Sequence, residues 1–337
     1  MELQLAKYHG LGNDFLVQVD LDGHGDIGPA ATVALCDRHR GVGADGVLRL
    51  SRGRRPGSLR MELRNADGGL AETSGNGLRC AALAAVHAAL VTCGDLILET
   101  AAGDSEVHVG QLDVAGAAEV RVAMGTLVVG EELAASGLPL GSGTVCSDAS
   151  GPARRAVQDA LAGRVARRVD AGNPHVVIYE RSPAPTDRSA IDVAAVGQAI
   201  ENGAAGGVNV EVVEVRGDSL SMIVWERGAG MTLACGSGSC AAAAAGRAAG
   251  LVGDRVEVTN PGGILLVELS GPALRPAAVL TGPARRVATV TVDLADLAYI
   301  ADLGAFGDSE RDELTADRDR ARVAGAASAA RAGVARA

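Results

Sequence analysis

Short runs in which apolar and polar residues alternate recur along the chain and predict β-strands. Clusters of glycine, proline and aspartate separate these runs, which is typical of antiparallel strands. In the first half the runs are FLVQVD, GVLRL, LRMELRN, LILETAAG and EVRVAMG. In the second half they are HVVIYE, VNVEVVEV, SLSMIVWERG and RVEVTNPGGILLVEL.

Two alanine-rich segments interrupt the strand pattern and predict helices over Leu78–Leu90 and Ser239–Ala249. Both are apolar on nearly every face, so each has to be buried, and small side chains let the surrounding strands come close. Weaker helix patterns cover Ala30–Arg38 and Val193–Glu201.

Each alanine-rich helix follows a similar glycine loop, SGNG from Ser74 and CGSG from Cys235, half a chain apart. The repetition predicts an α+β fold of two pseudo-symmetric domains, each a β-sheet wrapped round a central apolar helix. The expected units are an N-terminal half over 1–130, a C-terminal half over 131–275, a returning segment over 276–300 and a disordered or loosely helical tail over 301–337.

Composition narrows the class of protein. Only 2% of the 337 residues are aromatic, so the core has to be built from alanine, valine, leucine and isoleucine. The net charge of −10 argues against nucleic-acid binding through a basic surface. Charges at Glu2, Lys7 and Asp14 argue against a signal peptide, and no apolar run of ~18 residues predicts a membrane span. We therefore expect a cytoplasmic protein with reduced thiols.

The six cysteines form no CxxC pair, which argues against a zinc or thioredoxin-type site, so no metal is expected. One of them, Cys235, opens the second glycine loop. The others are interpreted as small buried apolar groups: Cys36, Cys80, Cys93, Cys146 and Cys240.

The paired loops suggest a chemistry. A helix N-terminus presents free N–H groups and a partial positive charge, so two facing each other could hold one carboxylate from both sides. The residue at each loop mouth would flank the same α-carbon, and we expect the helix dipoles to lower the pKa of a cysteine there. A cofactor-free racemase needs two such opposed groups. On these residues alone, CGSGSC also fits a tight turn before a buried helix, and GVGADG resembles a dinucleotide loop only weakly.

Six motifs in order resemble the diaminopimelate epimerase family. The resemblance runs from about Met1 to Val292. The motifs are HGLGNDF (His9–Phe15), CDRHRGVGADG (Cys36–Gly46), RNADG (Arg64–Gly68), GNPH (Gly172–His175), WERGAGMTLACGSG (Trp225–Gly238) and PGG (Pro261–Gly263).

The resemblance implies two pseudo-symmetric α+β domains with the active site in the cleft between them. It implies interconversion of LL- and meso-diaminopimelate without a cofactor, in the lysine and peptidoglycan pathways. The expected partner is a small amino-acid substrate, and a homodimer is possible because family members often form one.

Residue roles follow from the same resemblance. Cys235 matches one of two catalytic cysteines, and His175 lies where the family places a histidine near the thiols. The α-carboxylate cradle is matched by Gly75, Asn76, Gly236 and Ser237. Substrate-binding positions are matched by Asn13, Asn65, Asn173, Asn209, Glu226 and Arg227. Arg227 is expected to pair with the distal carboxylate of the substrate. Glu226 is expected to favour the distal ammonium and is also counted among the catalytic residues.

Each of these residues also has a plain structural interpretation. Asn65 and Asn173 suit turns, Glu226 and Arg227 could form an exposed pair, and His175 could be a buried histidine with its hydrogen bonds satisfied.

The chain departs from the family pattern at Ser74, which stands where the other catalytic cysteine is expected. A hydroxyl is far less acidic than a thiol, so His175 or a water would have to relay its proton. Three hypotheses stay open: a diaminopimelate epimerase with a Ser/Cys pair, an epimerase or racemase of another amino acid, or a relative that only binds or that exchanges the proton without inversion. A non-catalytic interaction protein is the alternative of a different class.

Overall fold

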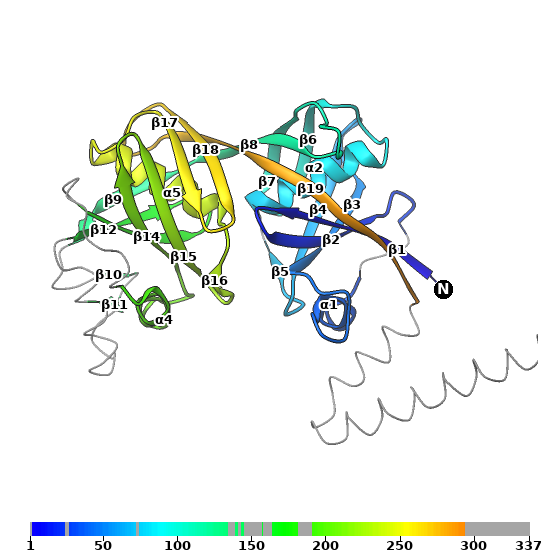
Figure 1. Ribbon diagram of the computed structural model, residues 1–337, viewed down its shortest axis with the longest axis horizontal. Helices are drawn as coiled ribbons and strands as arrows, with labels where there is room; N and C mark the ends of the chain where they lie inside the picture. Colours follow the sequence, from blue (N-terminus) through cyan, green and yellow to red (C-terminus); the bar gives the residue numbers. More distant parts are fainter. Residues whose placement is uncertain are drawn as a thin grey trace, which may run out of the picture.

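The computed structural model describes residues 2–23, 27–71, 74–133, 139–140, 143–144, 157, 164–180 and 191–293. These residues form two lobes of mixed α/β structure in which strands dominate (Figure 1). The predicted tail over 301–337 and Cys146 lie outside the described residues. None of the described helices is long and apolar enough to cross a membrane.

The N-terminal lobe surrounds α2 (Gly75–His87), while α1 (Pro29–Cys36) lies on its outside (Figure 1). Its strands are β1 (Glu2–Gly10), β2 (Asn13–Val19), β3 (Gly46–Arg52), β4 (Leu59–Asn65), β5 (Leu70–Ala71), β6 (Gly94–Thr100), β7 (Gly103–Val109) and β8 (Ala118–Thr126).

The C-terminal lobe surrounds α5 (Gly236–Ala248), with α4 (Val193–Gly203) outside it (Figure 1). Its strands are β9 (Val128–Leu133), β12 (Arg164–Asp170), β13 (Pro174–Glu180), β14 (Asn209–Arg216), β15 (Ser219–Glu226), β16 (Gly230–Thr232), β17 (Arg255–Asn260) and β18 (Gly263–Ser270). A separate two-stranded sheet pairs β10 (Pro139–Leu140) with β11 (Gly143–Thr144).

One long strand, β19 (Ala277–Asp293), runs between the lobes (Figure 1). Its first part pairs with β18 and β8, and its second part pairs antiparallel with β1. Backbone hydrogen bonds therefore join the two lobes along one continuous strand. This strand fixes the orientation of one lobe relative to the other.

Both lobes repeat the same pattern of strand pairing. In the first, β2–β3 and β4–β6 are parallel, and in the second, β13–β14 and β15–β17 are parallel. The expectation of antiparallel strands is therefore wrong at these four pairs. A parallel pair needs a crossover connection, and α1, α2, α4 and α5 lie in those connections.

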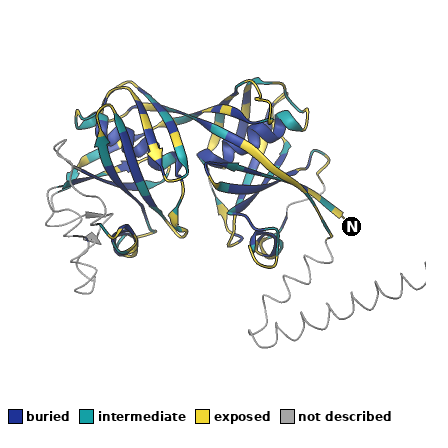
Figure 2. Ribbon diagram, viewed as in Figure 1, coloured by how far each residue is buried: buried dark blue, intermediate teal, exposed yellow. Residues whose placement is uncertain are grey.

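The two alanine-rich helices are buried as predicted (Figure 2). Cys80–Ala85 in α2 and Ala241–Ala245 in α5 are at most 3% exposed and lie in the two largest apolar clusters. Both helices begin three residues before the predicted start, at Gly75 and Gly236. Glycine is a poor helix former, but the side chain just before each glycine caps the helix.

Most cysteines lie where the apolar interpretation puts them. Cys36, Cys80 and Cys240 are buried, and desolvation raises the pKa of each thiol to about 12. The interpretation is wrong for Cys93, which is only half-buried because it lies in the turn just before β6.

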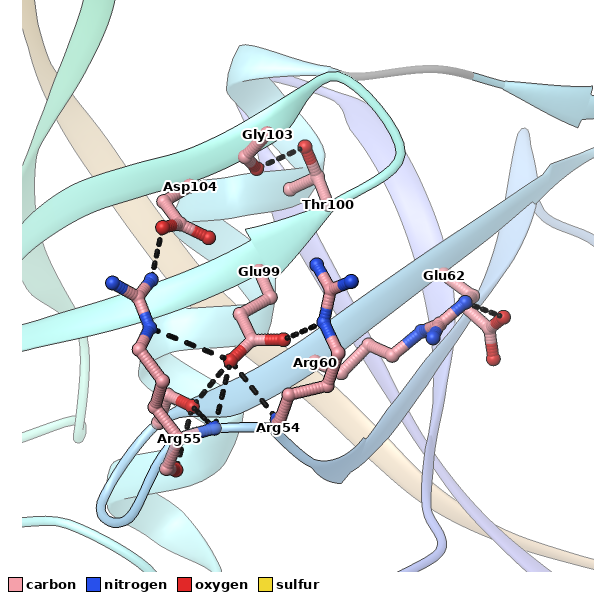
Figure 3. Close-up of polar contacts among 9 residues, drawn as sticks. Arg54, Arg55, Arg60, Glu62, Glu99, Thr100, Gly103 and Asp104 are labelled. Atoms are coloured by element: carbon pink, nitrogen blue, oxygen red, sulfur yellow. Dashed lines mark hydrogen bonds and ion pairs between the residues drawn. The ribbon is translucent and has the colours of Figure 1, made fainter.

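A buried glutamate fixes the loop between β3 and β4 against β6 (Figure 3). Oε1 of Glu99 accepts hydrogen bonds from the backbone N–H of Arg54 at 2.9 Å and from Oγ of Ser58 at 2.6 Å. The Arg54 side chain donates to Oε2 at 3.1 Å. These hydrogen bonds lower the pKa of Glu99 to about 2. The side chain that holds the loop is therefore an ionised carboxylate.

Candidate active site

A cavity of about 700 Å³ opens between the lobes. Every site residue proposed from the sequence lines it except His175. These lining residues are Asn13, Asn65, Ser74, Gly75, Asn76, Asn173, Asn209, Glu226, Arg227, Cys235, Gly236 and Ser237.

The N-termini of α2 and α5 meet at this cavity. Oγ of Ser74 accepts a hydrogen bond from the backbone N–H of Gly77 at 3.1 Å, and Sγ of Cys235 accepts from that of Gly238 at 3.3 Å. A Cβ atom placed on Gly236 would lie 3.4 Å from Cα of Gly75, so little more than the space of one methyl group separates the two helix starts. Two positive helix ends and two capping side chains therefore converge on one space.

Asn76 connects the two helix starts. Its Nδ2 donates to the backbone carbonyl of Ala234 and to Oδ1 of Asn13, both at 3.0 Å. Its Oδ1 accepts from the fully buried guanidinium of Arg79 at 2.8 Å. Arg79 therefore lies directly behind the first glycine loop. Burial lowers the pKa of its guanidinium, because moving a cation out of water costs free energy.

The thiol of Cys235 does not have the lowered pKa expected from the helix dipoles. Burial raises its pKa well above the ordinary value, and the charges of Glu226 and Glu211 raise it further. Hydrogen bonds from Ser237 and from the Gly238 N–H act in the opposite direction but are outweighed. Cys235 is therefore a protonated thiol. The sequence-based expectation did not include Glu226 and Glu211, because only folding brings these two carboxylates close to the thiol.

Glu226 lies at the end of β15, close to that thiol. Burial raises the pKa of its carboxyl, while hydrogen bonds with Thr232 and Cys235 lower it. Oγ1 of Thr232 donates to Oε1 of Glu226 at 2.5 Å. A carboxyl with a raised pKa, hydrogen-bonded to a thiol, can exchange a proton with it.

His175 lies behind the cavity wall and is 1% exposed. Its Nε2 lies 2.9 Å from Oδ1 of Asn173, which does line the cavity, and its Nδ1 lies 2.7 Å from Oε1 of Glu211. Sequence reasoning missed Glu211. A single glutamate within the apolar run VNVEV was the available signal, because such a strand is buried on both faces.

The far end of the cavity carries asparagines and an arginine. Oδ1 of Asn209 accepts from the backbone N–H of Arg227 at 2.9 Å, and its Nδ2 donates to the carbonyl of Pro174 at 3.2 Å. Nη1 of Arg227 donates to the carbonyl of Gly206 at 3.0 Å. The peptide bond of Arg227 is thus fixed while its exposed guanidinium reaches solvent, where a carboxylate can meet it.

Sequence reasoning also missed an ion pair beside Asn13. Arg38 and Asp45 line the cavity and form an ion pair at 2.7 Å, and Oδ2 of Asp45 accepts from Nδ2 of Asn13 at 2.7 Å. Both lie within the motif CDRHRGVGADG, which was used only to recognise the family. Over the described part of the chain, no three His, Cys, Asp or Glu side chains are placed to hold a metal ion.

Known proteins resemble this chain over most of its length. A family model described as diaminopimelate epimerase matches residues 5–129 and 167–287. The diaminopimelate epimerase of Prochlorococcus marinus (strain MIT 9313) is 35% identical over 303 residues, which cover 85% of this chain and 91% of that protein. The diaminopimelate epimerase of Cyanothece sp. (strain PCC 7425 / ATCC 29141) is 37% identical over 297 residues, covering 85% and 98%.

Solved structures share the fold at much lower identity. A phenazine biosynthesis protein of the PhzF family from Bacillus anthracis superposes with a TM-score of 0.65 at 13% identity, covering 87% of this chain and 99% of that one. A hydroxyproline epimerase from Agrobacterium vitis superposes with a TM-score of 0.59 at 17% identity, covering 86% and 91%.

Proposed function

Because the chain belongs to the diaminopimelate epimerase family and is an isomerase, we propose that it interconverts LL- and meso-2,6-diaminopimelate without a cofactor. Cys235 exchanges the α-proton on one side of the substrate, and Ser74 stands on the other. This reaction belongs to lysine and peptidoglycan precursor synthesis, which places the protein in the cytoplasm. The same proposal takes the two lobes as pseudo-symmetric halves joined by the returning segment.

The closeness of the two helix starts carries the proposal. Gly75 and Gly236 lie close together, and the side chain just before each glycine is the hydroxyl or thiol that caps its helix. An α-carboxylate lying against the N–H groups of both helices would hold its α-carbon between Ser74 and Cys235. The helix dipoles would also stabilise the extra negative charge that the carboxylate gains when the α-proton leaves.

The distal half of the substrate fits the other end of the cavity. Diaminopimelate carries a second carboxylate and a second ammonium, and Arg227 offers the charge complementary to that carboxylate, while Glu226, hydrogen-bonded to Cys235, belongs to the reacting end. The surrounding asparagines supply neutral donors and acceptors: Asn13, Asn65, Asn173 and Asn209. A smaller amino acid would leave Arg227 without a carboxylate, so the pocket favours a substrate charged at both ends.

Proton transfer starts from the protonated thiol. Glu226 takes the proton of Cys235, and the thiolate then removes the α-proton from one face of the substrate. The resulting carbanion takes the hydroxyl proton of Ser74 from the opposite face, and water returns a proton to the Ser74 oxygen. Glu226 then releases the proton it took to solvent, where it neutralises the hydroxide left by that water. Water is assigned the reprotonation of Ser74 because both hydrogen-bonding partners of the His175 ring, Asn173 and Glu211, lie on the Cys235 side.

A non-inverting relative is the second candidate. Glu226, Glu211 and His175 gather around Cys235, whereas the Ser74 hydroxyl accepts a hydrogen bond from a backbone N–H. If Ser74 fails to deliver its proton, Cys235 would exchange the α-proton and return it to the same face. A racemase of a different amino acid is tested by the same assay with that amino acid.

The deciding experiment incubates LL-diaminopimelate with the protein in D₂O and follows both deuterium at the α-carbon and the appearance of the meso form. Exchange with inversion supports the proposal, and exchange with retention supports the non-inverting relative. Absence of exchange with diaminopimelate rejects the proposed substrate. The variant Cys235→Ala should abolish exchange, whereas Cys93→Ala, a half-buried cysteine outside the cavity lining, should leave it unchanged.

A further inference from the structure

The two lobes place different side chains behind their reactive groups. Strand pairing aligns Phe15 with Gly46 in the first lobe and His175 with Asn209 in the second. Two residues further along the second strand of each pair stand Leu48 and Glu211. The matching positions therefore carry phenylalanine and leucine in one lobe, and histidine and glutamate in the other.

The glycine loops confirm that these positions correspond. A Cβ atom on Gly77, three residues after Ser74, would lie 3.5 Å from Cδ2 of Leu48. A Cβ atom on Gly238, three residues after Cys235, would lie 2.6 Å from Oε1 of Glu211. Leu48 and Glu211 thus occupy the same place beneath the two capping residues, and only the cysteine side has a charge there.

Glu211 and His175 form a pair that solvent does not reach. Both side chains are 0% exposed, and Nδ1 of His175 lies 2.7 Å from Oε1 of Glu211. A carboxylate only accepts hydrogen bonds, so Nδ1 is the ring nitrogen that donates to Glu211, and Nε2 faces Asn173. Oε2 of Glu211 is buried and has no hydrogen-bond partner among the described residues, so His175 is the group that balances this carboxylate.

We infer that Glu211 is a positioning residue for proton transfer at Cys235: it accepts a hydrogen bond from Nδ1 of His175 and so fixes the ring with Nε2 facing the Asn173 wall of the cavity. A buried carboxylate behind an imidazole fixes the orientation of the ring. The charge of Glu211 by itself raises the pKa of Glu226, the group that takes the thiol proton, and His175 acts in the opposite direction. Leu48 and Phe15 give Ser74 no such support.

The other titratable groups acting on this site come from two further elements. Among the described residues they are Glu226 at the end of β15 and Cys235 at the start of α5. Removing the charge of Glu211 should weaken the hydrogen bond that orients the His175 ring. The inference rests on the proposed function for its kinetic consequence, but the state of the His175 ring can be measured without substrate.

The test compares Glu211→Gln, which keeps the size of the side chain, with Glu211→Asp and with Glu257→Gln, an exposed glutamate of the same lobe. Glu211→Gln should lower kcat for α-proton exchange about tenfold or more, with KM changed less than about twofold. Glu211→Asp should restore part of the rate, and Glu257→Gln should match the unaltered protein.

A second measurement follows the ring nitrogens of His175 by ¹⁵N NMR on the ligand-free protein, assigned by the loss of its signals in His175→Asn. A proton on Nδ1 whose signal is shifted or lost in Glu211→Gln supports the inference. An unchanged Nδ1 signal, or an unchanged rate in a folded variant, overturns it. If the unaltered protein turns over no diaminopimelate while its ring responds as expected, the proposed function fails and the pairing of His175 with Glu211 stands.

Discussion

Asn76 in α2 donates a hydrogen bond at 3.0 Å to the backbone carbonyl of Ala234, the residue directly before Cys235. A side chain of the first lobe thus fixes the backbone that carries the thiol of the second. Since the same amide group also bonds Asn13 and Arg79, the separation of the two helix starts depends on one buried residue.

Replacing Asn76 should therefore disturb both lobes at once. Asn76→Ala leaves the carbonyl of Ala234 and the Arg79 guanidinium without this partner, which should lower the free energy of unfolding by about 1–3 kcal/mol. The rate of α-proton exchange should fall further than stability explains, because the two helix starts lose their common anchor. Urea unfolding and the D₂O assay measure the two effects. Asn202→Ala, an exposed asparagine in α4, is the control, and equal losses in the two variants would contradict this role.

Replacing Arg79 should affect activity more strongly than it affects the free energy of unfolding. Its guanidinium is fully buried, and its hydrogen bonds go to Asn76 and to backbone carbonyls such as that of Pro283. An apolar side chain of similar length avoids the cost of burying a charge, so Arg79→Met should change the free energy of unfolding by less than about 2 kcal/mol. Activity should nevertheless fall about tenfold, because Asn76 loses its orientation. Full activity in Arg79→Met would show that Asn76 needs no support.

Much of the fold could be predicted from residue patterns because each element is locally consistent. The alanine-rich helices, the strand runs and the twofold repetition are all visible in the sequence. The relative direction of neighbouring strands is not visible in the sequence. Here two strands pair in parallel where a helix crosses from the end of one to the start of the other. The helix starts were misplaced by three residues because capping by Ser74 and Cys235 outweighs the poor helix propensity of glycine.

The candidate site divides in a similar way. Residues in recognisable motifs converge on one cavity, but the protonation of Cys235 could not be predicted. It depends on Glu211, which is 24 positions away and looks like an ordinary strand residue until β14 is packed beneath α5. Electrostatic effects of this kind arise from tertiary contacts, so local sequence carries little information about them.

The Glu99 cluster predicts how stability depends on pH. The pKa of Glu99 in the folded chain is about 2, below the ordinary value of 4.5. Its contribution to stability is therefore fully present above about pH 4.5 and is lost as the pH falls toward 2. Glu99→Gln should be less stable than the unaltered protein at neutral pH, and the difference should shrink in acid. Urea unfolding at several pH values checks this, with Glu106→Gln on β7 as an exposed control. A difference independent of pH would mean that the charge of Glu99 is unimportant.

Ser74→Cys tests whether the serine limits the reaction. A thiol has a reference pKa of about 8.5 and donates a proton far more readily than a hydroxyl, so the rate of inversion should rise about tenfold or more in the variant. The assay needs a reducing agent, because a second thiol facing Cys235 across the cavity could form a disulfide with it. Ser105→Cys, on β7 and outside the cavity lining, controls for the added thiol, and Ser74→Ala should remove inversion while leaving exchange at Cys235. A lower rate in Ser74→Cys would show that the surroundings of this position, with Leu48 beneath it, are adapted to a hydroxyl, and the Ser/Cys pair would then be a mechanism in its own right.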